Sequence, residues 1–429
     1  MIKMSGYNLK WRKYGLKDNP YFITPLTIDG GVIPISKFVG RNEEIAELKG
    51  VIEMGGDIRY MIIGEPGVGK TSLLNFVRNE AANNDFFTPI REIEINKPMT
   101  GNEFIILTLS AIHEEIKRKD IKIEESLMQR LDALYELTKF GEISNDISNI
   151  SQLNKYKLIG LFNEVIDKIY PRFKGIIIHY DNLDNISEKE DIISLLGDVR
   201  DFLLNKRAIF FFVGDSFVSS VINMHKRISQ VFITPPLQVR GLSFEDVKRL
   251  LGERINTLRI DENVPTIEPH TEKAVKLLFN LHNGNIREIL NSLSCCVISL
   301  SYLNTPITID EDILRDTLFE KARKITQDLT DVEKEILTKI LNKEVFTPTE
   351  VKRLTNKSLQ NISSKYLPKL VYVGAIRLRN VEGRNRFYEV TPEIKWLKLE
   401  RTENDKNISK NRKEGKIKEI LNKSLKEFM

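Results

Sequence analysis

One short segment of the chain combines residue types that bind phosphate. Residues 64–71 read Gly-Glu-Pro-Gly-Val-Gly-Lys-Thr. The glycines let the backbone turn so tightly that successive N–H groups point inward, and the helix expected to follow directs its N-terminal dipole at the same anion. Lys70 would neutralise the β- and γ-phosphates of a nucleotide, and Thr71 would ligate Mg²⁺. The residues expected to contact ATP or ADP in this loop are Gly64, Glu65, Pro66, Gly67, Val68, Gly69, Lys70, Thr71 and Ser72.

An acidic segment further along the chain supports a nucleotide site. Residues 176–184 read Ile-Ile-Ile-His-Tyr-Asp-Asn-Leu-Asp, which is an apolar strand that ends in carboxylates. A carboxylate at the end of a neighbouring strand can hold Mg²⁺ through its water shell, and Asp181 is the natural candidate. The alternative is an aspartate that caps a helix after a core strand. The partner motif at 64–71 favours the metal role.

Short apolar runs are expected to position these two segments. Strands are predicted at residues 59–63, 89–95, 175–180, 208–213 and 231–234, with helices at 43–52 and 70–79. Apolar strands separated by helices are typical of a parallel sheet that is buried on both faces. We therefore predict an α/β fold with a five-stranded parallel P-loop sheet. About 80 residues of mainly helical pattern exceed an ordinary crossover and predict an insertion. Its polar centre, residues 141–154, is expected to be mobile.

The pattern changes twice towards the C-terminus. Strand signals stop after residue 240, and helical pattern continues from a capping box at Ser243–Asp246 to about residue 324. Beyond residue 329, a helix–turn–helix pattern followed by two strands predicts a winged helix. The predicted division is a leader (1–37), a P-loop ATPase core (38–240), an all-helical lid (241–325), a winged helix (326–400) and a basic tail (401–429).

Composition narrows the class of protein. Hydrophobic residues make up 41% of the 429 residues and charged residues 29%, as in an ordinary globular protein. No apolar run approaches the ~20 residues of a membrane span, and we see no secretory signal, so a cytoplasmic protein without a membrane partner is expected. Cys295 and Cys296 are adjacent on a predicted helix, so neither a disulfide nor a cysteine metal site is expected.

Positive charge is concentrated at the C-terminal end. The chain has 65 Lys and Arg and 60 Asp and Glu; residues 351–429 hold 20 and 9 of these, which leaves 45 and 51 in residues 1–350. A basic segment on an acidic body suggests that this segment meets a polyanion. The alternative is a tail that only keeps the protein soluble.

The predicted winged helix carries side chains that suit nucleic acid. The candidates are Gln360, Asn361, Ser364 and Lys365 on its second long helix, and Arg377, Arg379, Arg384 and Arg386 around the hairpin turn. These residue types contact base edges and phosphates, which predicts double-stranded DNA as a partner. Two alternatives remain: winged helices also serve as protein-binding or autoinhibitory modules, and alternating arginines can form the solvated face of a strand.

These segments resemble the AAA+ ATPases, and within them the group shared by signal-transduction (STAND) ATPases and origin-recognition-type initiators. The resemblance covers about residues 19–325. Residues 64–71 and 176–184 match the family's Walker A and Walker B motifs. Asn19-Pro20-Tyr21 followed by Phe38-Val39-Gly40-Arg41 resembles the entry segment that packs beside the adenine. The resemblance therefore implies nucleotide contacts for Val39, Gly40 and Arg41.

The resemblance implies further roles. Asp215 falls at the sensor 1 position and Arg227 where the family often carries an arginine finger, while Gly284-Asn-Ile-Arg287 resembles sensor 2, whose arginine reaches the γ-phosphate. The alternative for Arg227 and Arg287 is an ordinary surface arginine. The implied catalytic residues are Lys70, Asp181, Asn182, Asp184, Asp215, Arg227 and Arg287, and the implied Mg²⁺ ligands are Thr71 and Asp181.

One residue departs from the family pattern. The glutamate that usually follows the Walker B aspartate polarises the attacking water, and this chain has Asn182 instead. Asparagine can position a water but cannot accept its proton at neutral pH. Asp184, two residues further on, is the alternative carboxylate. We therefore predict slow hydrolysis, which suits a conformational switch.

The resemblance implies an ATP-dependent switch that binds DNA through its winged helix, in the manner of origin-recognition or transposition-regulating ATPases, and that self-associates on ATP. The alternative is a STAND-type signalling or defence ATPase. In that case the winged helix would be autoinhibitory and the partner would be an unknown protein.

Overall fold

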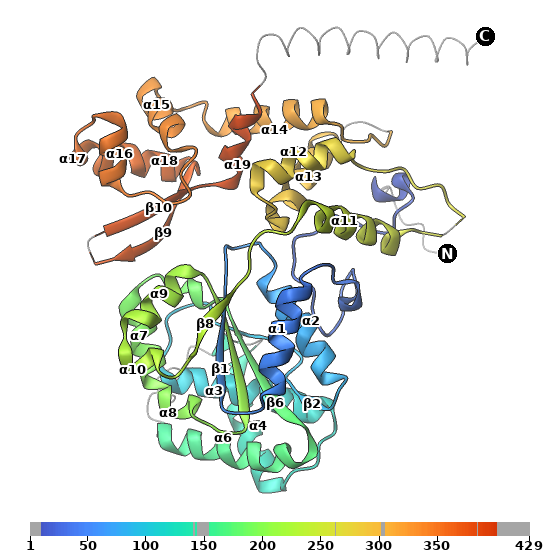
Figure 1. The fold of residues 1–429 in the computed structure, drawn as a ribbon, viewed down its shortest axis with the longest axis vertical. Helices are drawn as coiled ribbons and strands as arrows, with labels where there is room; N and C mark the ends of the chain where they lie inside the picture. Colours follow the sequence, from blue (N-terminus) through green and yellow to red (C-terminus); the bar gives the residue numbers. More distant parts are fainter. Residues whose placement is uncertain are drawn as a thin grey trace.

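The computed structural model describes residues 10–139, 142–143, 154–261, 263–301, 305–383 and 385–400. Figure 1 shows two tiers: a parallel sheet flanked by helices below, and above it a group of helices beside a smaller unit that ends in a β-hairpin. The predicted basic tail at 401–429 and most of the predicted mobile centre at 141–154 lie outside the described residues.

The lower tier is built on a parallel sheet. Its strands are β1 (Ile58–Ile63), β2 (Phe86–Phe87), β3 (Ile93–Glu94), β6 (Gly175–Asp181), β7 (Ala208–Gly214) and β8 (Ile233–Gln238). Their order is β2-β6-β7-β1-β8, and β3 pairs with β6 on the same side as β2. Because β2 and β3 share one side of β6, the six strands occupy five positions in the sheet. The predicted α/β fold with a five-stranded parallel sheet is confirmed.

Two strands differ from the prediction, and proline accounts for both. The strand expected at 89–95 is two short strands, β2 and β3, with Pro89 between them. Strand β8 begins two residues later than expected, and its pairing with β1 shifts register across Pro235 and Pro236. Proline has no N–H to give to a ladder and is confined to edge strands or bulges. Both of these strands lie at an edge of the sheet.

Helices cover both faces of the sheet. They are α1 (Asn42–Glu53), α2 (Lys70–Ala82), α3 (Gly101–Arg118), α4 (Glu125–Tyr135), α6 (Lys155–Ile169), α7 (Lys189–Asp198), α8 (Arg200–Leu203), α9 (Ser216–Met224) and α10 (Lys226–Ser229). Alternate residues of the central strands pack into two separate cores: Phe211 faces α1 and α2, and Phe210 and Phe212 face the insertion. Each such fully buried side chain contributes about 1.5–3 kcal/mol.

The upper tier contains the predicted lid. Its helices are α11 (Phe244–Leu258), α12 (Glu272–His282), α13 (Ile286–Ser299) and α14 (Glu311–Ile325). Segments from both ends of the chain complete its core: Tyr21 precedes the sheet in sequence, and Trp396 follows the winged helix. The indole Nε1 of Trp396 donates to Ser292 Oγ at 3.1 Å. The chain therefore returns from the winged helix to the lid.

The winged helix follows the lid. It comprises α15 (Asp331–Ile340), α16 (Pro348–Thr355), α17 (Leu359–Asn361), a π turn (Ile362–Tyr366), α18 (Leu367–Tyr372), β9 (Ile376–Glu382) and β10 (Asn385–Val390). The helix predicted from residue 358 is thus interrupted by a wider turn just before Pro368. Proline lacks the N–H and its ring clashes with the carbonyl of the preceding turn, so the backbone widens there. Among the described helices, none has the length and apolar character that a membrane span requires.

Candidate nucleotide-binding site

A pocket lies between the sheet and the lid. It is lined by Ile23, Thr24, Pro25, Pro66, Gly67, Gly69, Lys70, Thr71, Ser72, Asp181, Asn182, Asp184, Arg254, Ile286, Arg287 and Leu290. The fold therefore brings together three segments that the sequence singled out separately: the glycine-rich loop, the acidic end of β6 and the start of α13. They meet because the carboxyl ends of parallel strands share one edge of a sheet.

The loop after β1 has the conformation that its glycines allow. Gly67 and Gly69 have φ angles of +91° and +98°, which side chains rarely adopt. Gly67 is also a point of close approach, because a Cβ there would lie 2.6 Å from Asn285 Oδ1 and 2.7 Å from Arg287 Cβ. The loop consequently presents bare backbone to the pocket and to the lid.

Lys70 lies at the centre of the pocket. Its Nζ donates to the carbonyl oxygens of Gly64 at 2.7 Å and Glu65 at 3.1 Å. Burial lowers the pKa of Lys70, while the nearby Asp184, Asp181 and Asp215 carboxylates raise it. A buried ammonium that donates to two carbonyl oxygens can exchange them for phosphate oxygens.

Thr71 and Asp181 form a pair that fits Mg²⁺. The Thr71 hydroxyl donates to Asp181 Oδ2 at 2.7 Å, and the Asn182 N–H donates to Asp181 Oδ1 at 3.0 Å. Burial raises the pKa of Asp181 to about 6. A hydroxyl beside a carboxylate offers the oxygen ligands that Mg²⁺ prefers, with phosphate oxygens and water completing the octahedron. Over the described residues, no group of three or more His, Cys, Asp or Glu could hold a metal.

The carboxylate of Asp184 also belongs to the pocket. Asn182 adopts a φ of +61°, which asparagine tolerates better than most residues, and the chain turns there into a short 3₁₀ helix, Leu183–Asn185. This turn brings Asp184 back beside Asp181 and Asn182 in the pocket lining. Burial raises the pKa of Asp184, and the Lys70 ammonium lowers it. The orientation that the sequence left open is therefore towards the site.

The lid touches the loop through the start of α13. The Arg287 N–H donates to the Gly67 carbonyl at 3.2 Å, and Asn285 Nδ2 donates to the Pro66 carbonyl at 2.9 Å. The Asn285 side chain also caps α13 by accepting from the Glu288 N–H. Asn285 was not among the predicted site residues, although it lies within the sensor 2-like motif. Its cap fixes the helix end against the loop, which brings Arg287 to the pocket.

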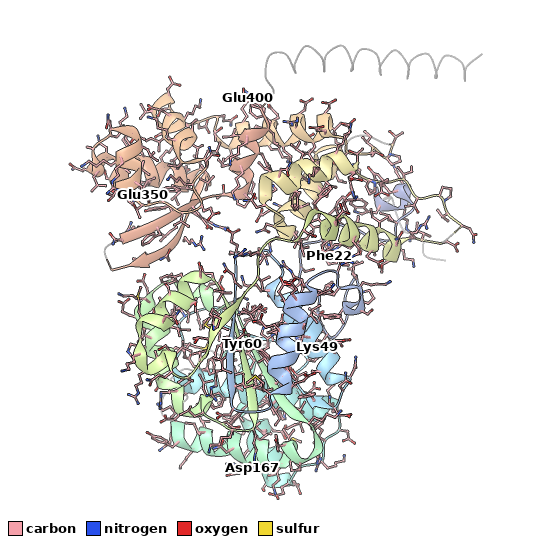
Figure 2. All side chains as sticks on the ribbon, in the orientation of Figure 1. Phe22, Lys49, Tyr60, Asp167, Glu350 and Glu400 are labelled. Atoms are coloured by element: carbon pink, nitrogen blue, oxygen red, sulfur yellow. The ribbon has the colours of Figure 1, made fainter. Side chains whose placement is uncertain are left out.

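Arg254 is a second residue that the sequence prediction missed. It lies on α11, lines the pocket, and donates to the carbonyl oxygens of Pro20 at 3.1 Å and Phe22 at 2.7 Å. Burial lowers the pKa of Arg254 to about 10. Figure 2 labels Phe22 at the junction of the two tiers, and its ring centroid lies 4.2 Å from the guanidinium. Helical spacing is the sequence signal that could have identified Arg254 as buried, because Arg254 shares the buried face of Val247, Leu251 and Leu258.

Several predicted nucleotide contacts do not line the pocket: Val39, Gly40, Arg41, Gly64, Glu65 and Val68. Arg41 instead contacts the phosphate loop without lining the pocket. Its guanidinium donates to the Val68 carbonyl at 2.8 Å and to the Arg240 carbonyl. The wall expected from the entry segment is formed by Ile23, Thr24 and Pro25. The reason is that Tyr21 turns away and is buried in the lid core.

Two residues with implied catalytic roles also lie outside the lining. Asp215 follows β7 and caps α9, with Oδ1 accepting from the Val218 N–H at 3.1 Å. Arg227 is exposed on α10. An arginine finger acts on a neighbouring subunit's nucleotide, so the role of Arg227 stays a prediction.

The winged helix displays only part of its predicted DNA-binding set. Gln360, Asn361, Ser364, Lys365 and Arg386 are exposed, and Arg384 lies outside the described residues. Arg377 pairs with Glu389, and Arg379 is largely covered through ion pairs with Glu389 and Asp215. In this conformation Arg379 faces the lower tier, and its role in DNA binding stays a prediction.

Comparison with known proteins gives distant relatives. No protein-family model matches the chain. The chain is 25% identical over 404 residues to an uncharacterized HTH-type transcriptional regulator of Methanocaldococcus jannaschii, covering 89% of this chain and 92% of that protein. It is 24% identical over 316 residues to an uncharacterized ATP-binding protein of the same organism, covering 65% of this chain and 82% of that protein.

Among solved structures, the chain is similar to the ORC2 protein of Aeropyrum pernix in its ADPNP–ADP complexes. The TM-score is 0.47 at 13% identity, and the match covers 90% of this chain and 97% of that one.

Proposed function

We propose that this chain is an AAA+ switch that binds ATP with Mg²⁺, hydrolyses it slowly and binds double-stranded DNA through its winged helix. The observation that carries the proposal is the pocket in which Lys70, the Thr71–Asp181 pair and Arg287 meet at the glycine-rich loop. These are the cations, backbone amides and oxygen ligands that a magnesium-bound triphosphate requires.

The polar residues at the phosphate loop and at the end of β6, together with Arg287, each have a role in this proposal. The loop amides and Lys70 bind phosphate oxygens, and Thr71 and Asp181 hold Mg²⁺. Arg287 joins the lid to the phosphates, which couples nucleotide occupancy to lid closure. Asn182 orients a water through its amide, and Asp184 accepts the proton of that water. Bound ATP supplies the anhydride bond whose cleavage resets the switch.

The DNA part of the proposal is supported by the exposed polar face of the helix after residue 358. Gln360 and Asn361 can pair with base edges, and Lys365 can pair with a phosphate. The M. jannaschii relative described as an HTH-type regulator is consistent with this assignment. We include cytoplasmic location and ATP-dependent self-association in the proposal as expectations from the sequence.

A specific contact favours a second candidate function. The wing strand β9 forms a bridge with the lower tier between Val381 and Glu188, as an autoinhibitory winged helix of a STAND-type signalling ATPase would. The partner would then be a protein. Indifference of the purified chain to DNA at low salt would favour this candidate.

The test of the proposal is calorimetric titration of the purified chain with MgATP and MgADP. Wild type is expected to bind both nucleotides, and Lys70→Ala should weaken MgATP binding by about 100-fold, since a buried charge-assisted contact is removed. Lys49→Ala is the control, because Lys49 is an exposed lysine that pairs with Glu80 across α1 and α2 and does not line the pocket. Equal affinities for the two variants would contradict the assignment of the pocket.

A further inference from the structure

The wing of the winged helix touches the ATPase core. Figure 1 shows the β9–β10 hairpin extending over α9. Two contacts hold it there. Val381 of β9 pairs in parallel with Glu188, just before α7, and Arg379 of β9 pairs with Asp215 at the start of α9. The two contacts come from neighbouring positions of β9 and reach two different loops of the core.

Arg379 lies between two carboxylates, one from each tier. Its Nη2 is 3.5 Å from Asp215 Oδ2, and its Nη1 is 3.5 Å from Glu389 Oε2 on β10. The Arg379 side chain is 19% exposed and that of Asp215 only 9%. Arg377, two residues earlier on the same strand face, pairs with Glu389 and is 53% exposed. Arg379 is therefore the arginine that the wing directs at the core.

Asp215 is close to the phosphate loop, because it follows Gly214 at the end of β7, and Gly214 pairs with Ile63, the residue before Gly64. Burial lowers the pKa of Lys70 and raises that of Asp184, and the Asp215 carboxylate raises the pKa of both groups. Arg379 lowers the pKa of Asp184. The four groups thus form one electrostatic cluster, although Asp215 and Arg379 do not line the pocket. An uncompensated Asp215 carboxylate, largely shielded from water, would repel an incoming polyphosphate.

We propose that Arg379 is a positioning residue of the nucleotide site. The winged helix contributes it to the ATPase core, and it acts by compensating the negative charge of Asp215. With Arg379 docked, the carboxylate of Asp215 is compensated, while Arg377 also pairs with Glu389. When the wing leaves, the negative charge of Asp215 has no partner on the wing and opposes the phosphates. The inference rests on the proposed binding of ATP and concerns its regulation.

A coupling between the nucleotide and DNA follows from this arrangement. A DNA phosphate that binds the Arg379 guanidinium removes it from Asp215 and lowers the affinity for MgATP. Because coupling between two binding sites is reciprocal, MgATP must weaken the wing's contact with DNA by the same factor. The same arginine cannot serve the ATPase core and a DNA groove at once.

The test is a double-mutant cycle on the full chain, with the dissociation constant of MgATP as the readout. Arg379→Ala is expected to weaken MgATP binding about five- to tenfold, within the usual range of coupling between sites. Arg379→Lys keeps the charge and should restore most of the affinity. In an Asp215→Asn background, Arg379→Ala should change the affinity less than about twofold, since no charge is left to neutralise. Asparagine preserves the cap of α9.

The controls separate this inference from the proposed function. Arg323→Ala removes an exposed arginine that pairs with Glu320 on α14, away from the site, and should leave MgATP affinity within about twofold of wild type. If wild type binds no MgATP, the proposed function fails. If wild type binds it but Arg379→Ala behaves as Arg323→Ala, or is equally harmful in the Asp215→Asn background, only the present inference fails.

A second arm adds a short DNA duplex to the same titration. Saturating duplex should weaken MgATP binding to wild type about fivefold and leave the Asp215→Asn variant unchanged. Unchanged or tighter MgATP binding by wild type would overturn the coupling between wing and nucleotide. Thermal melting of each variant checks that it folds. If Arg379→Ala does not fold, the comparison of Arg379→Lys with wild type still tests the inference.

Discussion

At the scale of single residues, the end of β6 shows how one backbone angle determines which group can do chemistry. Asn182 occupies the position where a glutamate is usual, and its positive φ turns the chain so that Asp184 returns to the pocket. Glutamate is less tolerant of that conformation than asparagine. A carboxylate displaced by two residues is therefore available as a base, at a position that depends on Asn182.

Hydrolysis is expected to depend on Asp184 and to be slow. Asp184→Asn should lower the single-turnover rate by about 10²-fold, the smaller end of general-base effects, because asparagine cannot accept the proton of water. The measurement is quenched-flow or manual single-turnover hydrolysis of labelled ATP, with Asn182→Glu beside it. Wild-type rates of ~1–100 s⁻¹, unaffected by either substitution, would contradict the slow-switch prediction.

Magnesium binding should depend on pH through Asp181. Burial raises its pKa from 3.8 to about 6. The protonated form thus stabilises the fold below pH 3.8, and this contribution is lost as the pH rises through about 6. Mg²⁺ needs the carboxylate, so MgATP affinity should fall about tenfold per unit below that pKa. Titrations between pH 5 and 8 should show this for wild type and not for Asp181→Asn.

The control for the pH titration is ATP without Mg²⁺, which corrects for protonation of the nucleotide itself. A pH dependence that is the same with and without Mg²⁺, or that persists in Asp181→Asn, would show that another group is responsible.

At the scale of elements, proline shapes the parts of the fold that departed from prediction. Pro89 interrupts one edge strand, Pro235 and Pro236 shift the register of the other, and a π turn lies just before Pro368 in the helix that follows residue 358. Just before and within that turn, Gln360, Asn361, Ser364 and Lys365 are exposed, while Ile362 and Leu367 are buried in the winged-helix core. The helix is therefore anchored on one face and free on the other.

Removal of one cation from this exposed helix face should weaken the binding of duplex DNA, whatever the base sequence of the DNA. Lys365→Ala is expected to reduce affinity for duplex DNA and to lower the slope of log affinity against log salt by about 1. Fluorescence anisotropy across salt concentrations measures both. Lys339→Ala is the matched control, because Lys339 is a partly exposed lysine on α15 that pairs with Glu335. Equal slopes for the two variants would argue against this face as the DNA contact.

At the scale of the whole molecule, segments far apart in the sequence pack together near the pocket. Residues near both ends pack in the lid core, through Tyr21 and Trp396, and the wing reaches down to the ATPase core. The segment that follows the winged helix therefore packs on the lid through Trp396, and the wing itself contacts the ATPase core through Val381. The predicted domain boundaries at residues 240 and 325 stay predictions.

Self-association is expected to place Arg227 of one copy near the nucleotide of another. Arg227→Ala should abolish MgATP-dependent assembly, seen by light scattering, and leave the MgATP dissociation constant within about twofold, because the residue lies outside its own pocket. Arg130→Ala, an exposed arginine paired with Glu164 across α4 and α6, is the control. Assembly that persists in Arg227→Ala would remove the arginine-finger assignment.

The sequence by itself determined the sheet, the phosphate loop and the order lid then winged helix, because these depend on local spacing of apolar residues, glycines and caps. It could also place Asp181 and Arg287 near the loop, since strand ends and helix starts meet at one edge. Only the tertiary structure decided that Arg254 lines the pocket, that Arg41 contacts the phosphate loop without lining the pocket, and that Arg379 faces Asp215. Those outcomes depend on packing between segments far apart in the chain, and the type and spacing of residues along one strand do not say which neighbour its face will meet.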